Sequence, residues 1–256
     1  MFFEREAWIS ATVLGAAMLL CSEIGRRFGA RSRLTHPERR GHHTRVEDAI
    51  FSILGLLLAF SFSAAAARFQ LREQQVVHEA TAIGDFTGAA GALAEPMRAE
   101  LSGLARDYTQ KRLEFARLKL DDPAQLEISR TTRELQSRLS EATYQAIRSG
   151  NTPSIHVALI NALNGLVTAY EERLAGLRHH LPAPILLMIT TFAILSALML
   201  GRLNGLESRP DWLPRIVFAA LISLVVWVML DLEQPRRGWV TVSETAMQEL
   251  IVPATP

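Results

Sequence analysis

The residues whose chemistry suits metal binding or catalysis are few in this chain, and their spacing favours neither task. Two histidine pairs occur, His42-His43 and His179-His180. Adjacent residues on a helix point to different faces, so neither pair favours a shared metal ion. Cys21 is the only cysteine, which excludes an internal disulfide and a thiolate metal site. We therefore predict no metal site and no cofactor.

Sequence motifs of the common enzyme classes are missing as well. The chain has no Walker loop, no dinucleotide glycine fingerprint, no HExxH motif and no GxSxG motif. Glu79 and Asp85 are too far apart in sequence for one helix face to present both carboxylates side by side. We interpret them as helix-surface or interhelical polar contacts. The protein is predicted not to be an enzyme, with no catalytic residue.

Four uncharged apolar blocks dominate the chain and must position whatever site it has. The clearest block, Ala49 to Ala67, has nineteen residues, and at about 1.5 Å per residue it matches the hydrocarbon thickness of a bilayer. The first block is interpreted as a span and not as a signal peptide, because MFFERE carries two Glu against one Arg. For the last block, a buried soluble helix is the alternative. We predict an all-α, multi-pass protein of the bacterial inner membrane with spans near 7–24, 49–67, 181–201 and 213–231.

A charged region with helical periodicity, 68–180, separates spans two and three. No proline interrupts the chain between Phe62 and Leu93, so span two is predicted to leave the membrane as one long helix. Breaks are predicted at 88–96, 121–123 and 149–151. The predicted domains are a transmembrane hairpin (1–67), an extramembrane helical bundle (68–180) and a second hairpin with a short tail (181–256).

Apolar residues in this region recur at spacings of three, four and seven, the pattern of a helix with one buried face. They are Leu101, Leu104, Tyr108, Phe115 and Leu118, followed by Ile155, Leu159, Ile160, Leu163, Leu166, Val167, Tyr170, Leu174 and Leu177. Asn161 and Asn164 interrupt the second stripe. We expect these two amides to be buried and to fix the register of the helix through hydrogen bonds.

Span two carries small residues at four-residue spacing: Gly55, Ala59, Ser63 and Ala67. Such a row lets another helix backbone approach closely. The partner is either a helix of the same chain or, in an oligomer, other copies around a shared axis that Phe51, Phe60 and Phe62 would narrow. Similar rows occur in the first and third spans, at Ala7, Ala11 and Gly15 and at Ala193, Ala197 and Gly201.

Arginines suggest how the chain lies in the membrane. The loop between the first two spans, 22–46, has seven of them and few acids, which predicts a cytoplasmic loop that can also contact anionic lipid headgroups. A net charge of +1 argues against nucleic-acid binding. Arg68 and Arg72 follow span two one helical turn apart, and they are candidate anion-attracting charges.

The segment DLEQPRRGWVTVS ends the fourth span abruptly. Asp231 and Glu233 lie at the helix end, where the dipole disfavours acids. We expect Arg236 and Arg237 to turn back across Pro235 and neutralise them. Gly238 would then free the backbone for a short extended tail, 239–242.

These residues also carry a family resemblance. The segments LLLAFSFSAAAARF, VVHEATAIG, EPMRAEL and DLEQPRRGWVTVS resemble the bacterial bestrophin-like membrane proteins, a domain of unknown function, in order along nearly the whole chain. The resemblance implies the plan of bestrophins, which are pentameric anion channels with four spans and a helical domain between spans two and three. It assigns these family-motif residues: Glu79, Ile83, Gly84, Pro96, Asn161, Asn164, Asp231, Pro235, Arg237 and Gly238.

Together these observations lead to a functional hypothesis with one alternative. The hypothesis is an oligomeric, bestrophin-like ion channel, selective for anions, in which span two lines the axis. Its expected partners are the lipid bilayer, further copies of the chain and anions, with no nucleic acid. The alternative is a membrane-anchored sensor or scaffold that transports nothing and whose helical bundle binds a partner.

Overall fold

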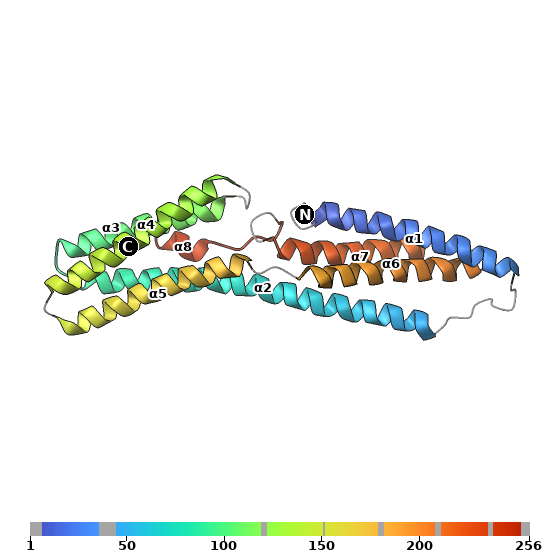
Figure 1. Ribbon diagram of the computed structural model, residues 1–256, viewed down its shortest axis with the longest axis horizontal. Coiled ribbons are helices and arrows are strands. Elements are labelled where there is room, and N and C mark those ends of the chain that lie inside the picture. Colours follow the sequence, from blue (N-terminus) through green and yellow to red (C-terminus); the bar gives the residue numbers. More distant parts are fainter. Residues whose placement is uncertain are drawn as a thin grey trace. The chain divides into compact units, whose positions relative to one another are not determined.

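The structure is a computed structural model that describes residues 7–35, 45–118, 122–150, 152–178, 182–207, 211–234 and 238–251. Every regular element in these ranges is an α-helix, which confirms the predicted all-α fold (Figure 1). The helices are α1 (Ala7–Thr35), α2 (Arg45–Gly91), α3 (Met97–Arg117), α4 (Ala124–Ser149), α5 (Pro153–Arg178), α6 (Ala183–Leu206), α7 (Leu213–Leu232) and α8 (Thr245–Glu249).

Four helices, α1, α2, α6 and α7, are long and apolar enough to cross a membrane. The chain is therefore a membrane protein, as predicted. Its described residues form two compact units. The span unit contains 7–68 and 182–240, and the helical unit contains 69–178 and 241–251.

In the span unit, α1 packs closely against α6 through glycines on both helices. A Cβ added to Gly25 would lie 2.1 Å from the Leu198 carbonyl oxygen, and one added to Gly201 would lie 1.9 Å from the Ser22 carbonyl oxygen. Because only glycine leaves room for such an approach, these positions bring the two backbones together. Gly15 of α1 faces the side chain of Ser223 of α7, where an added Cβ would lie 2.7 Å from Oγ.

The first span was predicted to end near residue 24, but α1 continues to Thr35. Gly25 and Gly29 do not end the helix because α6 packs directly on them, and that packing outweighs the low helix propensity of glycine. Four of the seven arginines assigned to the loop 22–46 therefore lie on α1: Arg26, Arg27, Arg31 and Arg33. Arg39 and Arg40 lie outside the described residues, and Arg45 begins α2.

α2 runs without a break from Arg45 to Gly91, as the uninterrupted sequence predicted. Its first part belongs to the span unit and its second part to the helical unit. The predicted breaks near 88–96, 121–123 and 149–151 are confirmed, since α3, α4 and α5 begin at Met97, Ala124 and Pro153.

The helical unit surrounds one apolar core to which all its helices contribute. Phe86 of α2, Leu101 and Tyr108 of α3, Leu139 of α4 and Leu159 of α5 are each fully buried in it. The apolar stripes seen in the sequence of α3 and α5 thus supply the core, as their spacing predicted.

The C-terminal segment differs from its predicted place as a tail of the second hairpin. Residues 241–251 belong to the helical unit, and they form the short helix α8. Met247 of α8 is completely buried in the core of that unit. No periodic pattern predicts this helix, because five residues are too few to show one.

Candidate functional site

The small-residue row of span two lies on the surface of the chain. Gly55, Ala59, Ser63 and Ala67 are all exposed, and a Cβ added to Gly55 would meet no atom within 4 Å. The opposite face of α2 is buried in the span unit by Leu54, Leu58, Ser61 and Ala65. The row therefore has no packing partner in the described part of the chain.

The corresponding rows of the first and third spans behave differently. Ala7 and Ala11 of α1 and Ala193 and Ala197 of α6 are buried within the span unit. The glycines that extend these rows, Gly15 and Gly201, contact α7 and α1 closely. Of the three rows found in the sequence, two pack against helices of the same chain, whereas that of α2 has no such partner within the described ranges.

Aromatic side chains flank the exposed face of α2. Phe60 is 67% exposed and Phe62 is 40% exposed, and their positions in the helix put them on opposite sides of the small-residue row. Phe51, which the sequence placed with them, instead packs edge-on against Phe218 of α7, with ring centroids 5.6 Å apart. Phe60 and Phe62 therefore remain the candidates for a constriction, and Phe51 belongs to the packing of the chain.

Both arginines proposed to attract anions have partners inside the chain. The Arg68 side chain donates from Nε to Glu233 Oε1 at 2.7 Å. Arg72 is only 4% exposed and donates to the Gly176 carbonyl oxygen at 3.4 Å. Their role as anion-attracting charges remains a prediction, but neither side chain is presented openly on the surface of α2.

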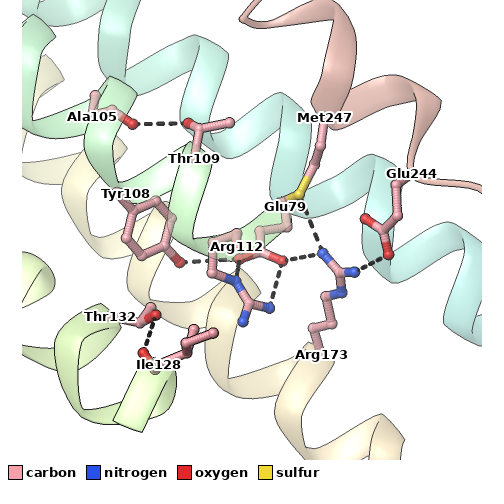
Figure 2. A network of polar contacts seen from close by, with 10 residues as sticks. All are labelled: Glu79, Ala105, Tyr108, Thr109, Arg112, Ile128, Thr132, Arg173, Glu244 and Met247. Atoms are coloured by element: carbon pink, nitrogen blue, oxygen red, sulfur yellow. Dashed lines mark hydrogen bonds and ion pairs between the residues drawn. The ribbon is translucent and has the colours of Figure 1, made fainter. Parts of the chain in front are cut away.

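Glu79 is the centre of a buried charge network in the helical unit (Figure 2). Its carboxylate accepts hydrogen bonds from Tyr108 at 3.0 Å, from Arg112 Nη2 at 3.0 Å and from Arg173 Nη1 at 2.7 Å. Arg173 also binds Glu244, next to α8. The interhelical contact expected for Glu79 is therefore present, and it joins α2 to α3, α5 and the C-terminal segment.

The charges of the network balance one another. Two carboxylates face two guanidinium groups, so the buried charges cancel. Arg112 also stacks over the Tyr170 ring, 4.8 Å from its centroid. Burial raises the pKa of the Tyr108 hydroxyl well above its usual value, and the Glu79 carboxylate raises it further. Burial alone would lower the pKa of Arg112, but Glu79 more than offsets this and raises it.

Sequence reasoning found Glu79 but missed its partners. Arg112 and Arg173 each lie on the apolar stripe of their helix, one turn from Tyr108 and Tyr170. An arginine on the buried face of a helix needs an acidic partner. These two positions could therefore have predicted a buried ion pair. Glu244 had no comparable signal, because the place of α8 was not predicted.

Other family-motif residues have structural roles. Ile83 is buried in the core, Gly84 faces Leu250, and Pro96 directly precedes α3. Asn161 and Asn164 were expected to be buried, but both are exposed. The stripe of α5 turns its leucines inward, and these two positions lie on the opposite side of the helix.

Asp231 stabilises the turn that follows the fourth span. Its carboxylate accepts hydrogen bonds from the backbone N–H groups of Trp239 and Val240, both at 3.0 Å. A Cβ on Gly238 would lie 2.8 Å from Asp231, so this turn requires glycine. The acids were expected to pair with Arg236 and Arg237, but these and Pro235 lie outside the described residues. The described partners are backbone amides for Asp231 and Arg68 for Glu233.

A groove of about 570 Å³ lies between α2 and α5 on the surface of the helical unit. Thr81, Asp85 and Gly88 line it from α2, and Asn161 and Gly165 line it from α5. Its lining mixes small residues with polar ones, and no group of three or more metal-ligating side chains occurs among the described residues.

Comparison with known protein families shows where the chain belongs. A family model described as the Bestrophin-like domain matches residues 16–247, which is most of the chain. No curated protein and no solved structure matches.

Proposed function

Because the chain belongs to the bestrophin-like family, we propose that it forms a homo-oligomer that conducts ions along a shared axis lined by span two. The observation that carries this proposal is the unoccupied small-residue face of α2. Gly55, Ala59 and Ser63 are exposed, although rows of the same kind on α1 and α6 are packed within the chain. In a bilayer, close packing between helices is a main source of association, and this face offers it to a second copy.

Phe60 and Phe62 would supply the gate. Exposed phenyl rings beside a face of small residues narrow an axial path and keep water out of it, which stops ions without a charged barrier. The resemblance to bestrophins implies anions as the permeant ions. Arg68 and Arg72 already have partners inside the chain, which argues against these arginines attracting anions. The proposal therefore extends to ion conduction and not to anion selectivity.

Purified full-length protein in mild detergent and in liposomes tests the proposal. We expect a symmetric oligomer by mass and an ion flux that rises when Phe60 is replaced by Ala. Trp8→Ala, an exposed aromatic on α1, is the matched control and should leave the flux unchanged. A monomer, or liposomes that stay tight to ions with and without Phe60→Ala, would leave a sensor or scaffold as the better account.

The orientation of the chain is part of the proposal. The arginines between the first two spans support a cytoplasmic position for the segment 22–46, whose first part is the end of α1, in a bacterial inner membrane. Single cysteines at Arg33 and Thr131 in a Cys21→Ser background test it. An impermeant thiol reagent should label position 131 in intact cells and spare position 33, and the opposite pattern would reverse the assignment.

A further inference from the structure

A groove of about 530 Å³ lies between α1 and α7, within the span unit. At its centre, Gly15 of α1 lies against Ser223 of α7. Further along α1, Ser22 accepts a hydrogen bond from Arg215, which lies nearer the start of α7. The two helices therefore run antiparallel, and the groove follows both of them.

The length of the groove matches one leaflet of a bilayer. Its lining residues extend over 8–19 of α1 and over 216–227 of α7. Eleven residue steps of about 1.5 Å give roughly 16 Å, whereas half of a hydrocarbon core about 30 Å thick is about 15 Å. An extended acyl chain that lies along the helices therefore fits the groove in length.

The two ends of the groove differ. Trp8 and Trp227 line one end, and Trp227 packs edge-on against Trp239, with ring centroids 6.0 Å apart. Indole rings are enriched at the level of lipid headgroups. Directly beyond the other end, Arg215 donates a hydrogen bond to Glu23 at 3.0 Å. The tryptophan end is therefore the end that suits a headgroup.

The lining of the groove suits hydrocarbon better than water or a polar ligand. Within the described part of the chain, none of the lining residues is charged. The Thr12 hydroxyl donates to the Trp8 carbonyl oxygen at 2.7 Å, and the Ser223 Oγ is buried beneath the groove. Water needs several polar partners to occupy such a place, whereas methylene groups gain dispersion contacts from apolar walls.

The shape of the groove suits a ligand narrower than a helix. Its floor consists of the small residues Ala11, Gly15 and Ala219. Larger exposed side chains stand beside this floor: Trp8, Leu19, Ile216 and Leu224. Helices that pack closely in a bilayer meet through small residues. Here the larger side chains keep a helix, about 10–12 Å wide with its side chains, away from the floor, but a polymethylene chain can reach it.

We infer that the groove between α1 and α7 binds one phospholipid of the surrounding bilayer. Its acyl chain fills the groove, and its headgroup lies at the end marked by Trp8 and Trp227. The groove is continuous with the surface that the membrane-spanning helices present to lipid. An empty groove would forfeit dispersion contacts that an acyl chain restores. The site is complete within one subunit, so it does not depend on the oligomer proposed above.

Native mass spectrometry of the full-length protein tests the site. The protein is reconstituted into vesicles of phosphatidylethanolamine and phosphatidylglycerol and then extracted into mild detergent, and one phospholipid should remain bound per subunit. Ala16→Phe with Ala220→Phe places rings on two exposed residues that line the groove, and should lower this retention several-fold. The matched control, Val13→Phe with Leu221→Phe, changes exposed residues of the same helices outside the groove and should retain the phospholipid.

Photo-crosslinking in the same vesicles locates the lipid without any substitution. The probe is a phosphatidylethanolamine with a diazirine in its acyl chain, and most of the label should fall on the groove-lining peptides of α1 and α7. This map decides the site even where a variant folds poorly. Label spread evenly over lipid-exposed residues such as Leu187 of α6 would overturn the inference, as would equal phospholipid retention by both variants. Loss of oligomer mass in the groove variant without loss of lipid would show that the groove binds a second copy instead.

Discussion

Among single residues, Glu79 has the most consequential environment in the helical unit. It is completely buried, and its two oxygens receive hydrogen bonds from residues of α3 and α5. A buried ion pair adds little net stability over apolar packing, but removing one partner leaves an uncompensated charge. The side chain therefore specifies how α2, α3 and α5 assemble.

Replacing Glu79 with Gln should lower the free energy of unfolding by about 3–5 kcal/mol, because Arg112 and Arg173 lose their shared carboxylate. Chemical denaturation in mild detergent, followed by circular dichroism, measures this. The control is Glu114→Gln on α3, which removes an exposed pair with Lys111 and should have no resolvable effect. Equal stability of the two variants would contradict a structural role for the network.

The raised pKa of Tyr108 predicts that the stability of the folded chain falls at alkaline pH. Its pKa is raised in the folded chain by burial and then by Glu79, so the folded state holds the phenol proton more tightly than the unfolded state. The associated stability is fully present below pH of about 10 and is lost as the pH rises above it. Ultraviolet titration of phenolate should show that Tyr108→Phe removes a step above the usual tyrosine range. Loss of a step near the usual value would refute the burial argument.

Among the elements, α1 and α2 use small residues for different purposes. Glycines of α1 and α6 let these two helices touch, whereas Gly55, Ala59 and Ser63 of α2 face outward. The sequence shows the same pattern in all three helices. Which face is already occupied depends on tertiary packing, so only the structure separates them.

Two alanine substitutions distinguish these uses. Gly201→Ala places a Cβ 1.9 Å from the Ser22 carbonyl oxygen, so α1 and α6 must separate, at a cost of about 1–3 kcal/mol. Gly55→Ala meets no atom of the chain and should not lower the stability of the single subunit. Thermal unfolding followed by size-exclusion chromatography compares them. A Gly55→Ala subunit that unfolds at lower temperature than Gly201→Ala would contradict the packing described.

Helix boundaries show what could be predicted from the sequence. Proline and glycine signals located the starts of α3, α4 and α5, since they act locally on the backbone. The start of the loop after the first span was predicted too early, because it was taken from the charged residues that follow the apolar block, whereas α1 stays helical to Thr35 in contact with α6. The partners of Glu79 and the burial of Met247 come from different elements, so they required the packed core.

For the whole molecule, the central claim is that the outer face of α2 in the span meets other copies of the chain. The family and the exposed row of small residues both bear on that assembly. Conduction depends on it, because one subunit has no axis to line.

The most direct test is disulfide cross-linking in native membranes with a Cys21→Ser background. Ala59→Cys puts a thiol on the exposed face of α2, and Leu58→Cys, its neighbour in sequence, puts one on the buried face. A mild oxidant should join Ala59→Cys chains into covalent dimers and leave Leu58→Cys chains monomeric. Ala59→Cys chains that stay monomeric, or equal cross-linking of both variants, would contradict the account.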